Sequence, residues 1–135
     1  MFAFRPAAPS DLPALLALDP TPGREPFLRR AMAVGEVHLA VDGDVLGYAV
    51  LEYTFFEQGF ISLLYVRAEM RRRGVGRALL QHLETLCTTR KLFTSTNLSN
   101  QPMQRLLTRL GYRLSGILHN LDEGDPELVY VKYLA

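Results

Sequence analysis

Residues 61–80, ISLLYVRAEMRRRGVGRALL, combine a short apolar strand, an arginine-rich turn with two glycines, and the start of an amphipathic helix. Gly74 and Gly76 have no Cβ, so a ligand oxygen can approach the backbone closely. The first N–H groups of the following helix lack partners within the helix and carry partial positive charge. Four arginines add formal charge: Arg71, Arg72, Arg73 and Arg77. This stretch therefore predicts a binding site for a phosphate-bearing ligand.

The spacing of the glycines excludes two familiar phosphate loops. A dinucleotide-binding fingerprint needs Gly or Ala three residues after the second glycine, where this chain has Leu79. The loop of nucleotide triphosphatases needs Lys followed by Ser or Thr after its last glycine, and here Arg77 follows Gly76. An arginine-rich solvated turn is the interpretation without function, and the flanking strand and helix argue against it.

Composition limits the class of protein. A length of 135 residues predicts a single domain, 1–135, and the formal net charge of +1 argues against nucleic acid as the main partner. Cys87 is the sole cysteine, which rules out an internal disulfide and suits a reducing compartment. No apolar run is long enough for a signal peptide or a membrane span, and no His, Cys or carboxylate grouping has metal-ligand spacing. We therefore expect a soluble cytoplasmic domain without a metal.

Hydrophobic periodicity predicts an α/β fold with elements in the order β-α-α-β-β-β-α-β-α-β-β. Hairpin turns are expected at Asp42-Gly43 and around Gln58-Gly59, and Ser10 is expected to cap the first helix. The strand–helix–strand unit of residues 60–97 predicts that the fourth and fifth strands are parallel neighbours. The expected strands are 2–5, 37–41, 45–53, 60–66, 92–97, 112–119 and 127–134, and the later helices span about 74–89 and 100–110.

Four consecutive polar residues end the fifth strand, Thr94 to Asn97. A strand with one buried face would alternate polar and apolar residues there. The run therefore predicts that both faces meet polar surroundings or water at this end, and fraying into a loop is the simpler alternative.

The order of elements resembles that of the GNAT superfamily of N-acyltransferases over most of the chain. Leu64-Tyr65-Val66 is similar to the family's cofactor-facing strand, and Arg71 to Gly76 is similar to its pyrophosphate loop. Asn100, Leu106-Leu107 and Gly111-Tyr112 resemble its second motif. The resemblance implies that the fourth and fifth strands splay apart and that pantetheine lies between them. The cofactor-binding residues so implied are Leu64, Tyr65, Val66, Arg71, Arg72, Arg73, Gly74, Val75, Gly76, Arg77, Asn97 and Asn100.

The same resemblance implies an N-acetyltransferase. It would move the acetyl group of acetyl-CoA to a primary amine, on a small molecule or a peptide N-terminus, by direct attack in a ternary complex. A backbone N–H suits the thioester oxygen, on which negative charge grows, and by similarity this donor is the amide of Val66. The amine must lose a proton, for which enzymes commonly supply a general base.

The chain departs from familiar members at the positions that usually move protons. Leu107 stands where many relatives have a tyrosine acid, and Phe60 and Ser95 stand where others have a glutamate base. Water could carry the protons, other side chains could substitute, or the protein could be a non-catalytic acyl-CoA-binding or regulatory module. The candidate substitutes are Glu52, Glu57, Ser62 and Tyr112; solvated glutamates and a packing tyrosine are the structural alternatives.

The acceptor side of the site is expected near the first two helices and the last hairpin. The hairpin connection carries four acids that would attract a cationic amine or simply form a solvated turn: Asp122, Glu123, Asp125 and Glu127. A monomer and a homodimer are both compatible with the sequence.

Overall fold

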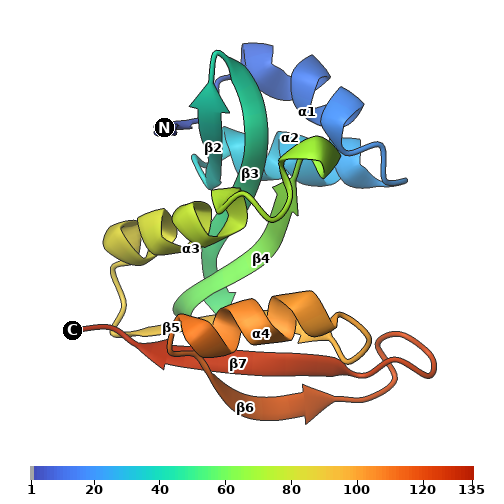
Figure 1. Cartoon of the computed structure of the whole chain (residues 1–135), viewed down its shortest axis with the longest axis vertical. Coiled ribbons are helices and arrows are strands. Elements are labelled where there is room, and N and C mark those ends of the chain that lie inside the picture. The colour runs from blue at the N-terminus through green and yellow to red at the C-terminus, as the bar shows by residue number, and fades with distance from the viewer. Residues whose placement is uncertain (1) are drawn as a thin grey trace. The chain divides into compact units, whose positions relative to one another are not determined.

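A computed structural model describes residues 2–135 and places seven strands in one sheet, in the order β1-β2-β3-β4-β5-β7-β6 (Figure 1). The strands are β1 (Ala3–Pro6), β2 (Val37–Asp42), β3 (Asp44–Phe55), β4 (Gln58–Val66), β5 (Lys91–Asn97), β6 (Arg113–Leu118) and β7 (Glu127–Tyr133). The helices are α1 (Leu12–Leu18), α2 (Arg24–Ala33), α3 (Val75–Leu86) and α4 (Gln101–Arg109), with short 3₁₀ turns η1 (Pro9–Asp11) and η2 (Ala68–Met70). The predicted α/β order is confirmed. No helix within residues 2–135 is long and apolar enough to cross a membrane.

The parallel pairing of β4 with β5 is also confirmed. Gly59, Phe60 and Ile61 pair with Leu92, Phe93 and Thr94, and the ladder ends there. The chain divides into two compact units, and β3 and β4 each contribute residues to both. The first unit contains residues through Leu51 together with Leu63–Leu86, and the second contains Glu52–Ser62 and Cys87–Ala135.

In the first unit, α1 and α2 pack against β2 and β3 around a fully buried cluster. Leu15 and Leu28 come from the helices, and Leu39, Tyr48 and Val50 come from the strands. Because neighbouring strand residues point to opposite faces, His38 lies on the face away from Leu39. There its ring meets the His82 ring of α3 edge-on at 6.2 Å, and His82 stacks on Phe4 at 4.5 Å.

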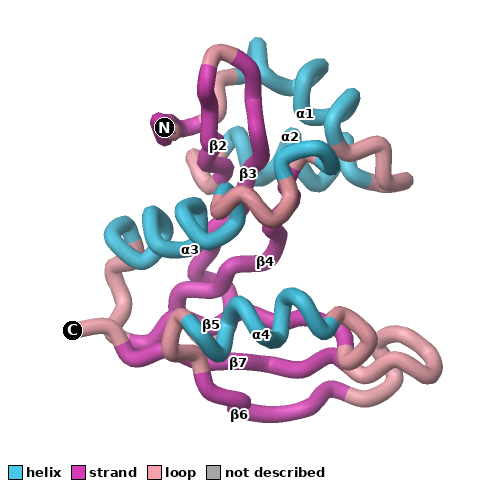
Figure 2. Tube along the Cα trace, in the orientation of Figure 1, coloured by secondary structure: helices cyan, strands magenta, loops and turns pink. Residues whose placement is uncertain are grey.

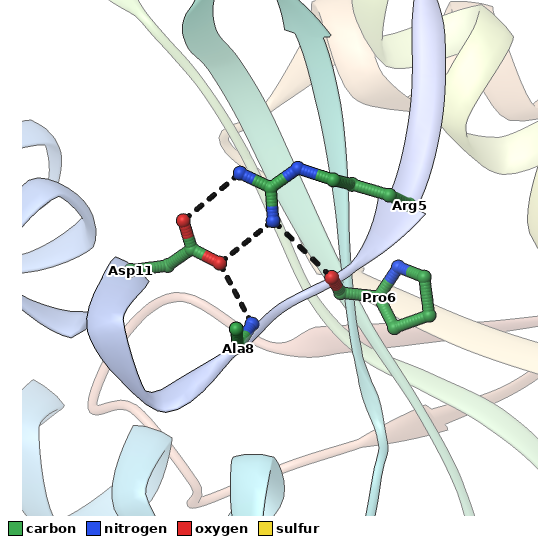
Figure 3. Close-up of polar contacts among 4 residues, drawn as sticks. All are labelled: Arg5, Pro6, Ala8 and Asp11. Atoms are coloured by element: carbon green, nitrogen blue, oxygen red, sulfur yellow. Dashed lines mark hydrogen bonds and ion pairs between the residues drawn. The ribbon is translucent and has the colours of Figure 1, made fainter.

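The start of the first helix differs from the expectation that Ser10 caps it. The chain first makes the turn η1, and the carboxylate of Asp11 accepts a hydrogen bond from the Ala8 N–H at 2.7 Å (Figure 3). Arg5 donates two hydrogen bonds to the same carboxylate, at 2.7 and 2.9 Å, and these hold the pKa of Asp11 below its ordinary value. Asp11, with two guanidinium donors, therefore organises this helix start in place of Ser10.

In the second unit, β5, β7 and β6 form an antiparallel group behind α4 (Figure 1). Lys132, on the same strand face as Tyr130, contacts the ring of Tyr112 just beyond α4, and Leu107 of α4 is fully buried. Residues 94–97 were expected to meet polar surroundings or water on both faces; water does not reach the face of Thr94 and Thr96, because both are buried. The Thr94 hydroxyl donates to the Ile61 carbonyl at 2.9 Å, which allows a polar side chain to be buried.

Two boundaries also differ from the expectation. The hairpin after β3 turns at Phe56 and Glu57, with φ of 52° and 63°, and Gln58-Gly59 already belongs to β4. Two consecutive left-handed residues match the twist of a tight hairpin, even though neither is glycine. Helix α3 ends at Leu86, so Cys87 lies just beyond it, and the Thr88 N–H bonds to the Tyr53 hydroxyl at 3.1 Å.

Candidate active site

The connection from β4 to α3 carries most of the predicted cofactor-binding residues. It leaves β4 at Val66, makes the turn η2, and passes through Arg71–Gly74 into α3 (Figure 2). All of these residues belong to the first unit, as do Leu64 and Tyr65. The structure thus brings together, in one segment, the residues that the glycine and arginine pattern singled out.

Gly74 lets the chain enter α3. Its φ of +83° is unfavourable for residues with a Cβ, although a Cβ built there would meet no atom within 4 Å. The Ala78 N–H bonds to the Gly74 carbonyl at 3.0 Å, so the N–H groups of the preceding helical residues have no acceptor one turn back. Val75 and Leu79 are buried and anchor the helix, and this leaves its N-terminal donors at an open, electropositive surface.

The four loop arginines fall into two groups. Arg71 folds back: its Nε donates to the Val66 carbonyl at 3.0 Å, and its guanidinium lies 5.4 Å from the centre of the Tyr65 ring. Arg72, Arg73 and Arg77 are exposed, and within residues 2–135 none of them forms an ion pair. Three positive charges therefore face solvent beside the α3 N-terminus.

The end of β4 is held tightly against β3. The Arg67 N–H donates to the Leu46 carbonyl at 2.8 Å, and the Arg67 guanidinium donates to the Val45 carbonyl at 2.6 and 3.0 Å. A Cβ on Gly47 would lie only 2.8 Å from the Tyr65 carbonyl oxygen. Only glycine allows this close approach, which fixes the backbone next to Val66.

A buried carboxylate that no sequence pattern indicated lies in the first unit, in contact with Tyr48 of β3. Asp19 is fully buried and accepts from the Tyr48 hydroxyl at 2.5 Å, Thr21 Oγ1 at 2.6 Å and Arg24 Nε at 2.7 Å. Burial alone would raise the pKa of Asp19, but the bonds from Thr21 and Tyr48 and the charge of Arg24 outweigh it and lower the pKa. The Tyr48 ring stacks on Tyr65, with centroids 6.2 Å apart.

The Asp19 cluster therefore stabilises the fold and does not act as a proton relay. Burial and the Asp19 carboxylate raise the pKa of Tyr48, so its phenol stays protonated. Asp19 stands before a Pro-Thr-Pro turn and belongs to no periodic pattern, so its partner 29 residues away could not be found from spacing.

The candidate proton-transfer residues lie in the second unit. Glu52 accepts a hydrogen bond from the Thr54 hydroxyl at 2.6 Å, and Tyr112 is buried beside Lys132. Glu57 is exposed in the hairpin turn. Ser62 differs, because its Oγ is buried and has no hydrogen-bond partner in the protein.

Asn97 and Asn100, the two asparagines expected at the cofactor, both have structural partners. Asn97 Nδ2 donates to Asp122 Oδ2 at 2.9 Å and to the Asp125 carbonyl at 3.3 Å. Asn100 caps α4, since its side-chain oxygen accepts from the Met103 N–H at 3.2 Å. Their role toward a cofactor stays a prediction.

Comparison with known proteins agrees with this geometry. Residues 9–112 match the model of the acetyltransferase (GNAT) family. A crystal structure of a GNAT-family acetyltransferase from Bacillus cereus is 31% identical, with a TM-score of 0.93 over 100% of this chain and 99% of that one. A comparison with curated protein sequences gave no significant match.

Two more distant structures share the fold. The ribosomal-protein-S18-alanine N-acetyltransferase of Escherichia coli is 19% identical, with a TM-score of 0.87 over 100% of this chain and 95% of that one. NAA60 of Arabidopsis thaliana, in complex with a bisubstrate analogue, is 21% identical, with a TM-score of 0.79 over 98% of each chain.

Proposed function

This chain belongs to the GNAT acetyltransferase family, and we propose that it transfers the acetyl group of acetyl-CoA to a primary amine by direct attack in a ternary complex. The observation that carries the proposal is the start of α3. There Gly74 leaves space beside the helix N-terminus, and three exposed arginines have no ion-pair partner among residues 2–135. In this proposal, residues 1–135 act as one acetyltransferase domain.

The residues at the start of α3 fit a diphosphate group. The N–H groups of Val75 and Gly76 supply donors, and Arg72, Arg73 and Arg77 supply charge that no carboxylate of the described chain neutralises. Arg71 is already engaged with Val66 and Tyr65, so we assign it to shaping the loop. When bound, acetyl-CoA supplies an acyl group activated as a thioester.

The chain's own contribution to the chemistry is mainly positioning. We assign the Val66 amide to the thioester oxygen, a contact of the kind that is commonly worth a few kcal/mol. Its rigid support by Gly47, Arg67 and Arg71 keeps that donor in place. Neither Asp19 nor Tyr48 is available to move a proton, since each is held in one protonation state by the other.

Ser62 is the remaining candidate whose structure favours a role with a ligand. A buried hydroxyl without a partner costs about 1–3 kcal/mol, and natural proteins rarely keep one. We propose that the Ser62 hydroxyl forms a hydrogen bond to a bound substrate and helps to orient it. A serine is too weak an acid or base to act alone, so this role is positioning and not proton transfer.

Two classes of acceptor deserve testing. The E. coli neighbour is named for acting on an alanine of a ribosomal protein, which supports a peptide N-terminus as one class. The bisubstrate analogue bound to the Arabidopsis neighbour supports simultaneous binding of both substrates in that protein. Small primary amines form the second class.

The decisive experiment is a turnover assay with acetyl-CoA and a panel of peptides and small amines, read as release of free thiol. Acceptor-dependent release above background is expected for at least one class. Binding of coenzyme A by calorimetry without turnover on any acceptor would replace this proposal with a non-catalytic acyl-CoA-binding module. The absence of both coenzyme A binding and turnover would contradict the proposed phosphate site itself.

Ser62→Ala tests the positioning role separately. Because the substitution removes an unpaired buried hydroxyl, we expect unchanged or slightly higher stability to urea, while kcat/KM falls about tenfold, as for one lost hydrogen bond. Ser10→Ala, at an exposed position, is the matched control. Full activity of Ser62→Ala would assign the hydroxyl no role in the reaction.

A further inference from the structure

The sheet of the second unit has one face that α4 does not cover. Alternation along the strands places Lys91 and Phe93 of β5, and Val129 and Tyr133 of β7, opposite the face of Leu92 and Lys132. An open groove of about 600 Å³ lies on this uncovered face. Its apolar lining comes from Phe55, Phe56, Phe93, Leu118 and Val129.

Large apolar side chains remain exposed along this groove. Phe56 is 82% exposed, Leu118 is 49% exposed and Tyr133 is 45% exposed. Beyond β6, Leu121 is 61% exposed. Of these, Phe56 and Leu118 line the groove, and exposed apolar side chains around a groove are typical of an interaction site.

One end of the uncovered face is basic. The charged groups of Arg90, Lys91 and Arg113 lie 5.5, 5.4 and 5.3 Å from the centre of the Tyr133 ring. Within residues 2–135 none of these three groups forms an ion pair, and their contact is with the ring. This end, the basic end, therefore presents three positive charges that the chain itself does not neutralise.

The other end of the same face is acidic. Asn97, Glu127 and Leu118 lie side by side across β5, β7 and β6, and the connection between β6 and β7 follows. Its acids are Asp122, Glu123 and Asp125, and with Glu127 they form the acidic end. Strand β7 runs from Glu127 to Tyr133, six residue steps or roughly 20 Å, so the two ends are well separated.

From this arrangement we propose that the uncovered face pairs with the same face of a second copy of this chain, with the strands of the two copies running in opposite directions. Such a twofold arrangement sets the basic end of each copy against the acidic end of the other, so both charge contacts form at once. The exposed apolar side chains of the face become buried between the two copies, where their burial supplies the affinity, and the charges set the orientation.

A second copy fits this face better than an addition to the edge of the sheet. Strand β6 is an edge strand, but its register shifts between Leu114 and Gly116, where Ser115 forms a bulge. A bulge in an edge strand disfavours pairing with a further strand. Opposite charges at the two ends of one surface make it complementary to itself, and a partner of a single charge sign would satisfy only one end.

Charge reversal tests the proposal without reference to catalysis. Lys91→Glu with Arg113→Glu leaves two carboxylates beside Arg90, so the basic end becomes net acidic. Glu123→Lys with Glu127→Lys sets two lysines against Asp122 and Asp125, so the acidic end loses its net charge. The second pair leaves intact the bonds of Asp122 with Asn97 and of Asp125 with Ser99. Arg105→Glu with Arg109→Glu, on the exposed side of α4, is the control with the same change in net charge as the first pair.

The readout is the molecular mass by analytical ultracentrifugation, from micromolar to near-millimolar protein, in the absence of acetyl-CoA. We expect a dimer for the wild type and the control, and a dissociation constant at least about tenfold higher for each charge-reversed variant alone. An equimolar mixture of the two variants should dimerise more tightly than either variant alone, because the unaltered acidic end of the first then meets the unaltered basic end of the second. Circular dichroism and urea unfolding establish that each variant is folded.

A wild type that stays monomeric over this range overturns the proposal. A dimer that both reversed variants retain also overturns it, because the contact must then lie elsewhere. A mixture that dimerises no more tightly than either variant alone, although the wild type dimerises, would contradict the twofold charge pairing. Since no step uses acetyl-CoA or an amine, these outcomes are independent of the acetyltransferase proposal.

Discussion

The two units of the molecule differ in whether their charged side chains have partners of opposite charge within the chain. In the first unit, the carboxylate of Asp19 is buried and is satisfied by Tyr48, Thr21 and Arg24. In the second unit, the basic end of the uncovered face contacts the Tyr133 ring, and no carboxylate of residues 2–135 forms an ion pair with it. A charge with internal partners contributes to stability, whereas a charge without them is available to bind another molecule.

The open charges of the two units also differ from each other. Arg73 and Arg77 stand beside a helix N-terminus, whose free N–H groups can share an anion with them. Lys91 and Arg113 lie on strands β5 and β6 and not at the start of a helix. Positive charge alone does not define a phosphate site, and the backbone donors are the reason why we propose the site at the first cluster.

The largest effect is expected at the buried carboxylate. Asp19→Ala leaves the Tyr48 hydroxyl and the Arg24 guanidinium without their acceptor and should lower the free energy of unfolding by about 3 kcal/mol at pH 7. Asp11→Ala removes a partly exposed ion pair and a hydrogen bond to the Ala8 N–H, and it should cost about 1 kcal/mol. Urea denaturation measures both, and equal losses would show that burial of Asp19 is not what matters.

The second effect concerns coenzyme A. Gly74→Glu places a bulky like charge where the diphosphate is proposed to bind, and we expect its affinity to fall about 100-fold, as for two lost charge-assisted hydrogen bonds. A φ of +83° also strains any side chain at this position. Gly35→Glu, with φ of +74° and open space, controls for that strain. Calorimetry showing the same coenzyme A affinity for both variants would place the phosphate site elsewhere.

A smaller effect separates the two basic clusters directly. Arg73→Ala with Arg77→Ala should weaken coenzyme A binding several-fold, by roughly 1 kcal/mol, since exposed charges contribute modestly. Lys91→Ala with Arg113→Ala should leave that affinity within about twofold, because no helix N-terminus accompanies those charges. Equal losses in the two double variants, measured by the same titration, would mean that general attraction and not a site explains binding.

The smallest effect is a pH dependence of the first unit. Burial lowers the pKa of both His38 and His82, and the mutual repulsion of their charges adds to the effect at His38. The pKa of each histidine is therefore lower in the folded state than in the unfolded state, where it is about 6.5. The free energy of unfolding is highest above this pH and falls as the pH drops through it, because protonation then favours the unfolded state.

Urea midpoints at pH 7.5 and 5.0 test this dependence. The drop between these pH values should shrink in a His38→Gln, His82→Gln variant and persist in His119→Gln, at an exposed position. An unchanged drop in the double variant would assign it to other groups.

Much of the fold could be predicted from local pattern. The loop of residues 71–76 and the order of elements follow from glycine placement, arginine content and periodicity, all of which act over a few residues. The boundary errors have local causes as well. Phe56 and Glu57 adopt left-handed conformations without a glycine signal, and the carboxylate of Asp11, instead of the Ser10 hydroxyl, bonds the backbone at the first helix, through the Ala8 N–H.

What could not be predicted depends on contacts between distant residues. Tyr48 finds Asp19 across 29 positions, and Tyr133 meets Lys91 only because β5 and β7 pair in one register. The burial of Thr94 within the polar run Thr94–Asn97 could not be predicted, because it depends on an acceptor in another strand, the Ile61 carbonyl. That the buried Ser62 hydroxyl has no hydrogen-bond partner among residues 2–135 depends on all of its neighbours in the fold, and no local pattern indicates it.

The discontinuous course of the chain through its two units has a consequence for evolution and for protein engineering. Residues 52–62 belong to the second unit although sequence of the first unit flanks them on both sides. A single genetic crossover therefore cannot exchange either unit whole between homologues. Chimaeras of this family should keep their function only when the segments 52–62 and 87–135 are inherited from the same parent.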